Sequence, residues 1–399
     1  MKKMKIGDIC TLNPKINDDL PSESLISFIP MSSVSIDGKF MTTDTLISSK
    51  AKNYTLFQGG DVLFAKITPC MENGKGAIAR GLLNGYGAGS TEFIVLRPNI
   101  ELITAKWLYL YLSQRSFRWE CQQHMTGSAG QKRVPPKYLA SCEIPVPTIS
   151  EQERIVSKIE ELFSKLDACV VELHAAKEKL KIYRQAAITQ AFPALSEENT
   201  VKLNDIASIS GGITKGRKLD GHDSITLPYL RVANVQNGFL DLREVKSIQL
   251  KKSEMDKYLL KYDDVLYTEG GDRDKLGRGT VWRNEIEDCV HQNHVFKARL
   301  KLDCALPEYV AYWSMSTPAR NYFYQKGKQS VNLASINKTV LSNLLLPLPS
   351  VTDQQKTIES ISARISVADN IEQSLDVSLQ QAEALRQSIL KQAFDGELV

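Results

Sequence analysis

The sequence predicts an α+β protein in which two tandem mixed domains with twisted sheets are separated by two long helices. The helices are expected to form an antiparallel coiled coil with a pseudo-two-fold relation between the halves. Three observations predict this fold class: an internal repeat, short β-type runs in each half, and a long apolar heptad pattern at the end of each half. A chain of 399 residues is long enough for two or three domains.

The internal repeat has a constant offset of 202 residues. Sliding the chain against itself by this distance places Leu139 on Leu341 and Asp167 on Asp369. The segment "RQAAITQAF" (184–192) then coincides with "RQSILKQAF" (386–394), and more than fifty residues align without a gap. Composition bias would not keep the register over such a length, so we interpret the chain as a tandem duplication.

The first part of each half, residues 1–147 and residues 201–349, predicts a mixed domain. Runs such as "LISFIPM", "DVLFAKI" and "EFIVLRP" are bounded by Gly, Asn, Asp or Pro, as strands commonly are. Each domain also has one helical stretch, expected over 105–123 in the first and 307–325 in the second. Strands with few helices indicate an α+β domain with a twisted sheet.

The second part of each half predicts a long helix, over 148–192 and 350–399, with a linker at 193–200 after the first helix. Ser150 with Glu153 resembles a capping box, and the second copy has a similar pair 202 residues later. About 40 residues at a rise of ~1.5 Å make each helix roughly 60 Å long.

Apolar residues follow steps of four and three along both helices, which is the a/d pattern of a coiled coil. Two such seams in one chain are expected to bury each other, because a bare seam of this length would promote aggregation. The alternative is that the two helices dock separately on partner proteins. The expected seam residues are Ile155, Ile159, Leu162, Leu166, Leu173 and Leu180 in the first helix, and Ile361, Ile371, Leu375, Leu385 and Ile389 in the second.

Composition and charge restrict the class of protein only loosely. The net charge of +4, from 50 Lys and Arg against 46 Asp and Glu, permits nucleic-acid binding but does not indicate it. No apolar run approaches the ~20 residues of a membrane helix, and the N-terminus lacks the apolar segment of a signal peptide. The seven cysteines form no C-x-x-C motif, so we expect a cytoplasmic protein in a reducing compartment.

A search for catalytic motifs finds only incomplete ones. "VPPK" (134–137) lacks the polar and aromatic residues that flank the two prolines in DNA amino-methyltransferases. "GGITKGRK" (211–218) lacks the hydroxyl residue that follows the lysine of a P-loop. Glu244 and Lys246 with Asp223 could imitate a nuclease triplet, but such triplets are common by chance. A stand-alone enzyme is therefore the weakest alternative, and we expect no catalytic residue.

One segment of the second half has the residue types of a metal site. Cys289, His291 and His294 could ligate a metal ion, but the segment alternates as a β-strand does and has no second pair of ligands. A strand with two histidines is the better interpretation. We expect neither a metal nor another cofactor on this chain.

Basic and small polar residues gather in the loops between the expected strands. Arg and Lys can neutralise phosphates, whereas Arg, Gln and Asn can pair with base edges in the major groove. One such loop alone would be interpreted as a solvated turn, but the loops recur at matching places in both halves. The candidate DNA-binding residues are Lys66, Lys75, Ser128, Gln131, Lys132, Arg133, Thr214, Lys215, Arg217, Arg231, Arg273, Arg278, Lys326 and Lys328.

Two long motifs carry a family resemblance. "IPVPTISEQERIVSKIEELFSKLD" (144–167) enters the first helix, and "LRQSILKQAFDGELV" (385–399) closes the second. Weaker matches are "STEFIVLRP" (90–98), "YLRVANVQNG" (229–238) and "HQNHVFKARL" (291–300). Together they resemble the specificity (S) subunit of type I restriction–modification systems, over essentially the whole chain.

The resemblance implies that each mixed domain is a target-recognition domain that reads one half of a bipartite, asymmetric site on double-stranded DNA. The coiled coil would set the spacer and dock two methylation (M) subunits, with motor–nuclease (R) subunits joining the full complex. A subunit of this kind is non-catalytic, and its methylation partner is expected to use S-adenosylmethionine. It would act in the cytoplasm in bacterial or archaeal defence. A coiled-coil structural adaptor without DNA specificity is the alternative from another class.

Overall fold

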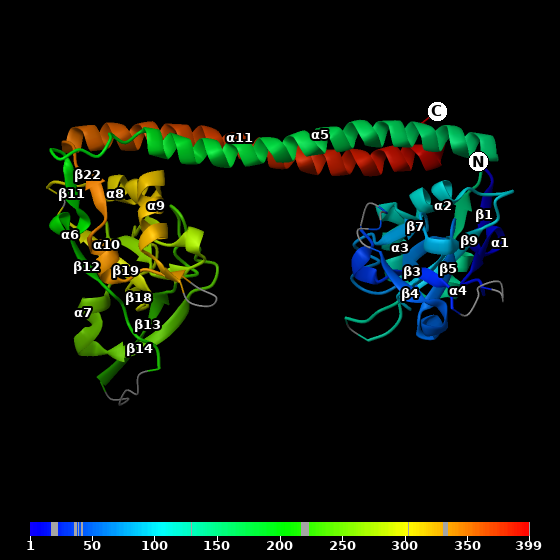
Figure 1. Ribbon diagram of the computed structural model, residues 1–399, viewed down its shortest axis with the longest axis horizontal. Helices are drawn as coiled ribbons and strands as arrows, with labels where there is room; N and C mark the ends of the chain where they lie inside the picture. The colour runs from blue at the N-terminus through cyan, green and yellow to red at the C-terminus, as the bar shows by residue number, and fades with distance from the viewer. Residues whose placement is uncertain are drawn as a thin grey trace. The chain divides into compact units, whose positions relative to one another are not determined.

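The computed structural model of this chain describes residues 1–16, 23–35, 38, 40, 43–128, 130–216, 223–301, 303–329 and 334–398. The chain divides into two compact units. Unit 1 is Met1–Leu173 with Val377–Val399, and unit 2 is His174–Asp376. Each unit holds one mixed domain, part of helix α5 (Ile149–Gln190) and part of helix α11 (Val351–Asp395), as Figure 1 shows.

Unit 1 is built around two four-stranded sheets. Its strands are β1 Lys3–Lys5, β2 Cys10–Leu12, β3 Leu25–Ile29, β4 Asp44–Ile47, β5 Thr55–Gln58, β6 Val62–Ala65, β7 Gly76–Ile78, β8 Tyr86–Gly89, β9 Phe93–Pro98 and β10 Glu143–Pro145. Its shorter helices are α1 Ile6–Ile9, α2 Ala105–Leu112, α3 Arg115–Gln123 and α4 Pro136–Ser141, with the 3-10 turns η1 Met31–Ser33, η2 Ser48–Asn53 and η3 Leu83–Gly85. One sheet has the order β2-β9-β6-β7 and is antiparallel. The other has the order β4-β3-β8-β5, in which β3 and β8 run parallel.

Unit 2 repeats most of this topology, but its second sheet has three strands, β14-β13-β18, where that of unit 1 has four. Its strands are β11 Thr200–Lys202, β12 Ala207–Ser210, β13 Ser224–Leu230, β14 Lys246–Lys251, β15 Val265–Thr268, β16 Gly270–Gly271, β17 Gly279–Val281, β18 Val290–His291, β19 Val295–Leu300, β20 Lys328–Gln329, β21 Ala334–Ser335 and β22 Leu345–Pro347. Its shorter helices are α6 Leu203–Ile206, α7 Met255–Tyr258, α8 Pro307–Met315, α9 Thr317–Lys326 and α10 Lys338–Ser342, with the 3-10 turns η5 Lys252–Glu254 and η6 Arg273–Lys275. The order β12-β19-β15-β17 matches β2-β9-β6-β7, and β13 is antiparallel to β14 but parallel to β18. The structure therefore confirms the α+β class.

The helical stretch of each mixed domain is broken into two helices. The predicted helical stretches over 105–123 and 307–325 are therefore confirmed in their extent, but neither is one continuous helix. Gln114 has an extended backbone (φ −64°, ψ 135°) between α2 and α3. Ser316 is extended before α9, whose first turn contains Pro318. Proline lacks the N–H that a continuous helix would use at this point, so it starts a new helix instead.

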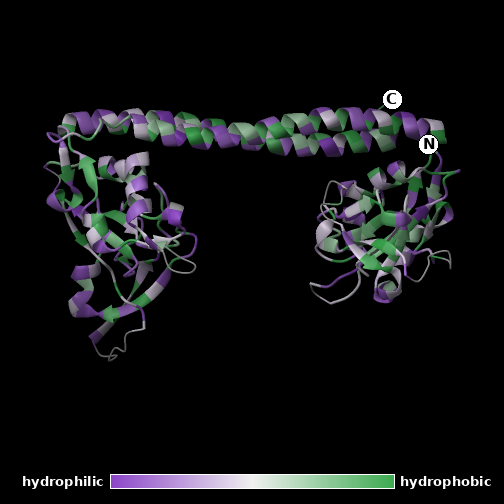
Figure 2. Ribbon diagram, in the orientation of Figure 1, coloured by the Kyte–Doolittle hydropathy of each residue, from purple (hydrophilic) through white to green (hydrophobic). Residues whose placement is uncertain are grey.

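The core of each unit joins the strands to the long helices. In unit 1 the fully buried Trp107 lies in one hydrophobic cluster with Ile155 and Ile159 of α5. In unit 2 Trp313 and Phe323 belong to the cluster under β15 and β19. Figure 2 shows hydrophobic strands inside each unit and alternating hydropathy along the long helices. Each fully buried aliphatic side chain, such as Ile159, contributes about 2 kcal/mol to folding.

The caps of both long helices lie two residues before the predicted capping positions. At α5, the Thr148 hydroxyl donates to a carboxylate oxygen of Glu151 at 2.8 Å, and so does the Thr148 backbone N–H, at 3.0 Å. At α11, Ser350 and Asp353 form the matching pair, with Oγ to Oδ2 at 2.8 Å. The prediction of a capping box at Ser150 is wrong because the residue that directly follows the extended Pro-x-Pro segment already satisfies the first turn.

Within each unit the two long helices pack antiparallel. In unit 1 Arg386 forms an ion pair with Asp167, and its guanidinium carbon lies 4.3 Å from the ring centroid of Phe163. In unit 2 Arg184 forms the matching ion pair with Asp369, at 2.5 Å. The same Arg–Asp contact thus recurs 202 residues apart, which confirms the antiparallel pairing that the sequence predicts.

The heptad register of α11 differs from the predicted one at two positions. Ile371 and Leu385 are 45% and 51% exposed, so their assignment to the seam is wrong. The next residues, Glu372 and Arg386, are half-buried and make ion pairs with α5. The prediction followed apolar residues only, whereas long charged side chains can bury their aliphatic stems in the seam. The buried or half-buried seam residues are Ile155, Ile159, Leu162, Leu166, Leu173, Leu180, Ile361, Leu375 and Ile389.

A buried glutamine ties each long helix to the mixed domain of its unit. The Gln152 amide oxygen accepts from Thr104 N at 2.8 Å, and its nitrogen donates to Leu102 O and Pro147 O at 2.8 and 2.9 Å. Gln354 makes the equivalent three contacts at 2.8–2.9 Å. Both glutamines are fully buried. A buried amide is stable only when it is hydrogen-bonded, so these contacts determine where each helix meets its domain.

A phenylalanine at the C-terminal end of each long helix packs on an aromatic pair. In unit 1 the Phe394 ring lies 4.5 Å from Trp107 and 5.0 Å from Tyr111, centroid to centroid. In unit 2 Phe192 lies 5.0 Å from Tyr309 and packs at a similar distance on α8 Trp313. The end of the second long helix therefore covers the first mixed domain, and the end of the first covers the second.

Candidate nucleic-acid interface

Three loops of unit 1 meet through hydrogen bonds. The ammonium of Lys75, in the loop between β6 and β7, donates to Met31 O of the loop after β3 at 2.9 Å. Thr68 N in the same β6–β7 loop donates to Lys132 O at 3.0 Å. These two contacts join residues that are 44 and 64 positions apart in the chain. The resulting surface carries basic and amide side chains from separate segments.

The centre of this loop cluster is an ion pair. Arg133 donates from Nε and Nη2 to the two carboxylate oxygens of Glu92, at 2.9 and 2.8 Å. This hydrogen bonding lowers the pKa of Glu92 below its usual value, so the carboxylate stays ionised. Lys66 lies beside the pair, and its ammonium donates to Thr91 O at 2.7 Å.

The matching loops of unit 2 are connected in a similar way. Arg278, which lies 203 residues after Lys75, donates from Nη1 to Gln236 Oε1 of the loop after β13 at 2.7 Å. The strands β16, β21 and β20 form a small sheet that joins the loop after β15 to the segment after α9. The loop arrangement is therefore repeated, although the side chains that connect the loops differ.

The centre of the loop cluster in unit 2 has different residue types from the centre of the cluster in unit 1. Glu269 N donates to His294 O at 2.9 Å, as Lys66 N donates to Glu92 O at 2.9 Å, so these residues occupy equivalent positions. In unit 2 a carboxylate oxygen of Glu269 lies 2.7 Å from His294 Nδ1. The Glu269 carboxylate thus takes the place of the Lys66 ammonium. The His294 imidazole takes the place of the Glu92 carboxylate.

The predicted DNA-binding residues fall into three groups. Those with exposed side chains are Ser128, Gln131, Lys132, Thr214, Lys215, Lys326 and Lys328. Those with hydrogen bonds inside their own unit are Lys66, Lys75, Arg133, Arg231, Arg273 and Arg278. Arg217 lies outside the described residues.

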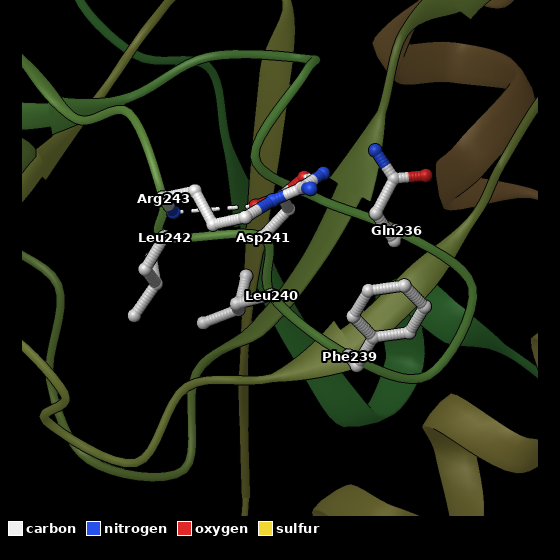
Figure 3. Close-up of a pocket in the computed structure, with 6 residues that line it drawn as sticks. All are labelled: Gln236, Phe239, Leu240, Asp241, Leu242 and Arg243. Atoms are coloured by element: carbon white, nitrogen blue, oxygen red, sulfur yellow. Dashed lines mark hydrogen bonds and ion pairs between the residues drawn. The ribbon is translucent and has the colours of Figure 1, made fainter. Parts of the chain in front are cut away.

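The candidate residues include Arg231 at the start of the loop after β13 but not Phe239 or Arg243, which line an open pocket of about 720 Å³ later in that loop (Figure 3). Phe239 is 60% exposed, and Arg243 donates to both carboxylate oxygens of Asp241, at 2.9 and 2.6 Å. The Arg243 contact lowers the pKa of Asp241 to about 2. An exposed aromatic ring and an arginine that line one open pocket suit stacking on bases and contact with phosphates. The "NGF" turn (237–239) is the sequence signal that could have indicated it.

The residues considered for a metal site do not converge. Burial lowers the pKa of His291 to about 4, and its Nδ1 lies 2.6 Å from Val295 O. His294 is instead paired with Glu269, and Cys289 is buried. In the part of the chain that the structure describes, no three His, Cys, Asp or Glu side chains are grouped to hold a metal ion.

Glu244, the centre of the suspected nuclease triplet, pairs with Lys246 at 3.2 Å at the surface. Among the described helices, none has the length and apolar character needed to cross a membrane.

Comparison with known proteins identifies similar chains. A family described as "Type I restriction modification DNA specificity domain" matches residues 1–181 and 196–381. The EcoAI specificity subunit of Escherichia coli is 44% identical over 161 residues, which are 40% of this chain and 27% of that subunit. The EcoKI specificity subunit of Escherichia coli K12 is 26% identical over 317 residues, which are 76% of this chain and 68% of that subunit. The chain thus aligns with about a quarter of the length of its EcoAI relative.

Two solved structures share the fold. The HsdS subunit from Thermoanaerobacter tengcongensis superimposes with a TM-score of 0.60 at 18% identity, covering 100% of this chain and 97% of that one. A chain described under "Structural basis underlying complex assembly and conformational transition of the type I R-M system" gives a TM-score of 0.76 at 18% identity, over 100% of this chain and 98% of that one.

Proposed function

Because this chain belongs to the type I restriction–modification DNA specificity family, we propose that it is the non-catalytic DNA-recognition subunit of a restriction–modification complex. Each unit reads one half of a bipartite, asymmetric site on double-stranded DNA. The observation that carries this proposal is the three-loop cluster, which recurs in both units with different side chains. Two identical clusters would favour a palindrome, whereas two different clusters favour two different half-sites.

The exposed side chains supply the two kinds of contact that DNA recognition needs. Lys132 in unit 1 and Lys326 in unit 2 are exposed, and an ammonium can neutralise a phosphate of either strand. Gln131 is exposed next to Lys132, and its amide can pair with a base edge. Contacts of the first kind position the protein, and contacts of the second kind read the sequence.

The long helices supply the connection to the rest of the complex. They are far more alike in sequence than the loops, which suits a role that both share. They set the spacer between the half-sites and dock two methylation (M) subunits, with motor–nuclease (R) subunits completing the assembly. The M subunit uses S-adenosylmethionine, and this chain binds no cofactor.

The spacer role is tested by the length of the helices. Insertion of one heptad into both helices should lengthen the spacer of the methylated site, because it moves the two units further apart along the DNA. Mapping of methylated positions in cells that carry the longer chain measures the spacer. An unchanged spacer would contradict this role.

The recognition function is tested with the full chain in complex with its M subunit. Genome-wide mapping of methylated positions first gives the site, and a gel-shift assay then compares that duplex with random duplexes. We expect site-selective binding that weakens steeply with salt. The structural-adaptor alternative instead predicts no preference for any sequence at any salt concentration.

The contribution of phosphate contacts is tested by Lys132→Ala. We expect lower affinity for the site, an unchanged base preference, and a salt dependence reduced by about one counterion. Lys326→Ala is the matched variant in unit 2 and should behave alike. A change of base preference in either variant would mean that the lysine reads a base rather than a phosphate.

A further inference from the structure

Arg133 of unit 1 is a partly exposed arginine whose direction is fixed by a carboxylate. Its side chain is 41% exposed, and that of Glu92 is 24% exposed. Three of its five N–H groups are used, two by Glu92 and one by Gln131 O at 3.0 Å. Among the described residues, the remaining two N–H groups, one on each terminal nitrogen, have no partner, so the guanidinium can still donate a pair of hydrogen bonds.

The backbone under this side chain is held on both sides. Arg133 N donates to Thr126 O at 2.8 Å, and Thr126 N donates to Arg133 O at 3.0 Å. On the other side Arg133 bridges to Ile67, and the next residue, Val134, donates to Lys66 O at 2.8 Å. A side chain anchored in this way loses little conformational freedom on binding, which favours selectivity.

The chemistry of two adjacent donors points to one base. In the major groove, guanine presents two neighbouring acceptors, N7 and O6, which match a guanidinium fork. Adenine presents N7 beside an amino donor, so a pair of donors is mismatched there. Exposed arginines otherwise move freely and contact phosphates as readily as bases. The bidentate contact with Glu92 removes that freedom.

We infer that Arg133, positioned by Glu92, reads a guanine in the half-site that unit 1 binds. The inference rests on the proposed function and adds to it the base, the reading residue and the positioning residue. Lys132, the neighbour of Arg133, has no such carboxylate contact in the described structure and keeps its role as a phosphate contact.

Unit 2 has no arginine at the position that matches Arg133, so it cannot read a guanine there with a guanidinium. The position 202 residues after Arg133 is Ser335, and the equivalents of Lys66 and Glu92 are Glu269 and His294. An ionised carboxylate only accepts hydrogen bonds, and one imidazole N–H cannot supply the pair of adjacent donors that guanine N7 and O6 match. The two half-sites should therefore differ at the corresponding base pair.

The test uses the full chain in complex with its M subunit and a duplex that carries the mapped site. Each guanine of the site is replaced singly by 7-deazaguanine, which lacks the N7 acceptor. We expect one guanine whose replacement weakens wild-type binding about tenfold and leaves Arg133→Ala unaffected. Lys132→Ala and His294→Ala serve as matched controls and should both remain sensitive to that replacement.

The positioning role of Glu92 has its own readout. Glu92→Gln should keep most of the affinity for the site but lose most of the discrimination at the same guanine, and Glu92→Asp should restore part of it. Should Arg133→Ala fail to fold, Arg133→Lys replaces it, because an ammonium is a point donor that cannot form the fork.

Three results separate the possible failures. If the mapped site has no guanine in either half, the inference is wrong. It is also wrong if every 7-deazaguanine replacement weakens the Arg133 variant as much as the wild type, which would leave Arg133 with a purely structural role in tying its loop to Glu92. If the wild-type complex shows no site selectivity at all, the proposed function itself fails.

Discussion

Unit 1 and unit 2 hold their frameworks with the same buried contacts, and they differ where their loops meet. In unit 1 the buried Asp61 accepts two hydrogen bonds from Arg97, at 2.8 and 2.9 Å. In unit 2 the buried Asp264 accepts the matching pair from Arg299, at 2.8 and 2.7 Å. A buried carboxylate that loses its partner is strongly destabilising, so neither residue of such a pair can change alone.

The loop clusters are under no such restriction. Glu92 and Arg133 of unit 1 correspond to His294 and Ser335 of unit 2. Glu92 pairs with Arg133, whereas His294 pairs with Glu269, and neither arrangement buries an unpaired charge. After the duplication, the buried Asp–Arg contacts, which water cannot replace, stayed the same in both units. The exposed contacts between loops diverged. Three predictions test how far the likeness of the frameworks extends.

The largest expected effect concerns the aromatic contact at the end of each long helix. Phe394 in unit 1 is 7% exposed, whereas Phe192 in unit 2 is half-buried. Phe394→Ala should lower the free energy of unfolding by about 3 kcal/mol or more, because it empties a packed site between two aromatic rings. Phe192→Ala should cost less. Urea unfolding of the full chain measures both, with Val367→Ala at an exposed helix position as control.

Comparison of the two losses in unfolding free energy tests whether the different burial of Phe394 and Phe192 determines their contributions. Equal losses from Phe394→Ala and Phe192→Ala would mean that the two helix ends contribute alike in spite of their different exposure. Because alanine has a higher helix propensity than valine, a loss in the Val367→Ala control would show that truncation of any helix side chain lowers stability, whether or not an aromatic contact is lost.

The second prediction concerns a buried histidine that unit 1 lacks. His291 is fully buried in unit 2, and position 89, its equivalent in unit 1, is Gly89. Burial lowers the pKa of His291 to about 4. Because the unfolded chain binds this proton more readily, the stabilisation is complete above about pH 6.5 and is lost as the pH falls toward about 4, by roughly 3 kcal/mol.

Thermal unfolding at several pH values checks this prediction. The transition of unit 2 should shift downward between about pH 6.5 and pH 4, and the shift should shrink in His291→Gln. His124→Gln, at an exposed position in unit 1, is the matched control. An acid shift of the same size in His291→Gln would assign the pH dependence to carboxylates instead.

The smallest expected effect concerns the helix seam. In unit 2 Lys177 pairs with Asp376 at 2.6 Å and lies 3.9 Å from Glu372, whereas the equivalents of Lys177 and Glu372 in unit 1 are Leu379 and Val170. Lys177→Leu should therefore change the urea midpoint only slightly, because exposed ion pairs contribute little. Any loss should disappear near 1 M salt, where the screening length is about 3 Å. A loss that persists there would indicate a packing defect.

Some features of the candidate nucleic-acid interface can be predicted from the sequence, and others cannot. The exposure of Lys132 and Lys326 follows from their place in polar loops, which the composition of those segments already indicates. The contact of Arg133 with Glu92 joins residues 41 positions apart, and no local pattern predicts it. The exposed Phe239 was missed because an aromatic residue in a turn has the same signal as one that folds back into a core.

The duplication, the α+β class and the existence of two long helices follow from the sequence alone, because a constant offset and a heptad period are properties of the chain itself. The face of α11 that meets α5 does not follow from it. Ile371 and Glu372 both continue an acceptable pattern, and the partner helix with its ion pairs selects Glu372. The packing of Phe394 on Trp107 is likewise a result of tertiary structure, because that contact closes a loop of almost three hundred residues and depends on packing across the whole unit.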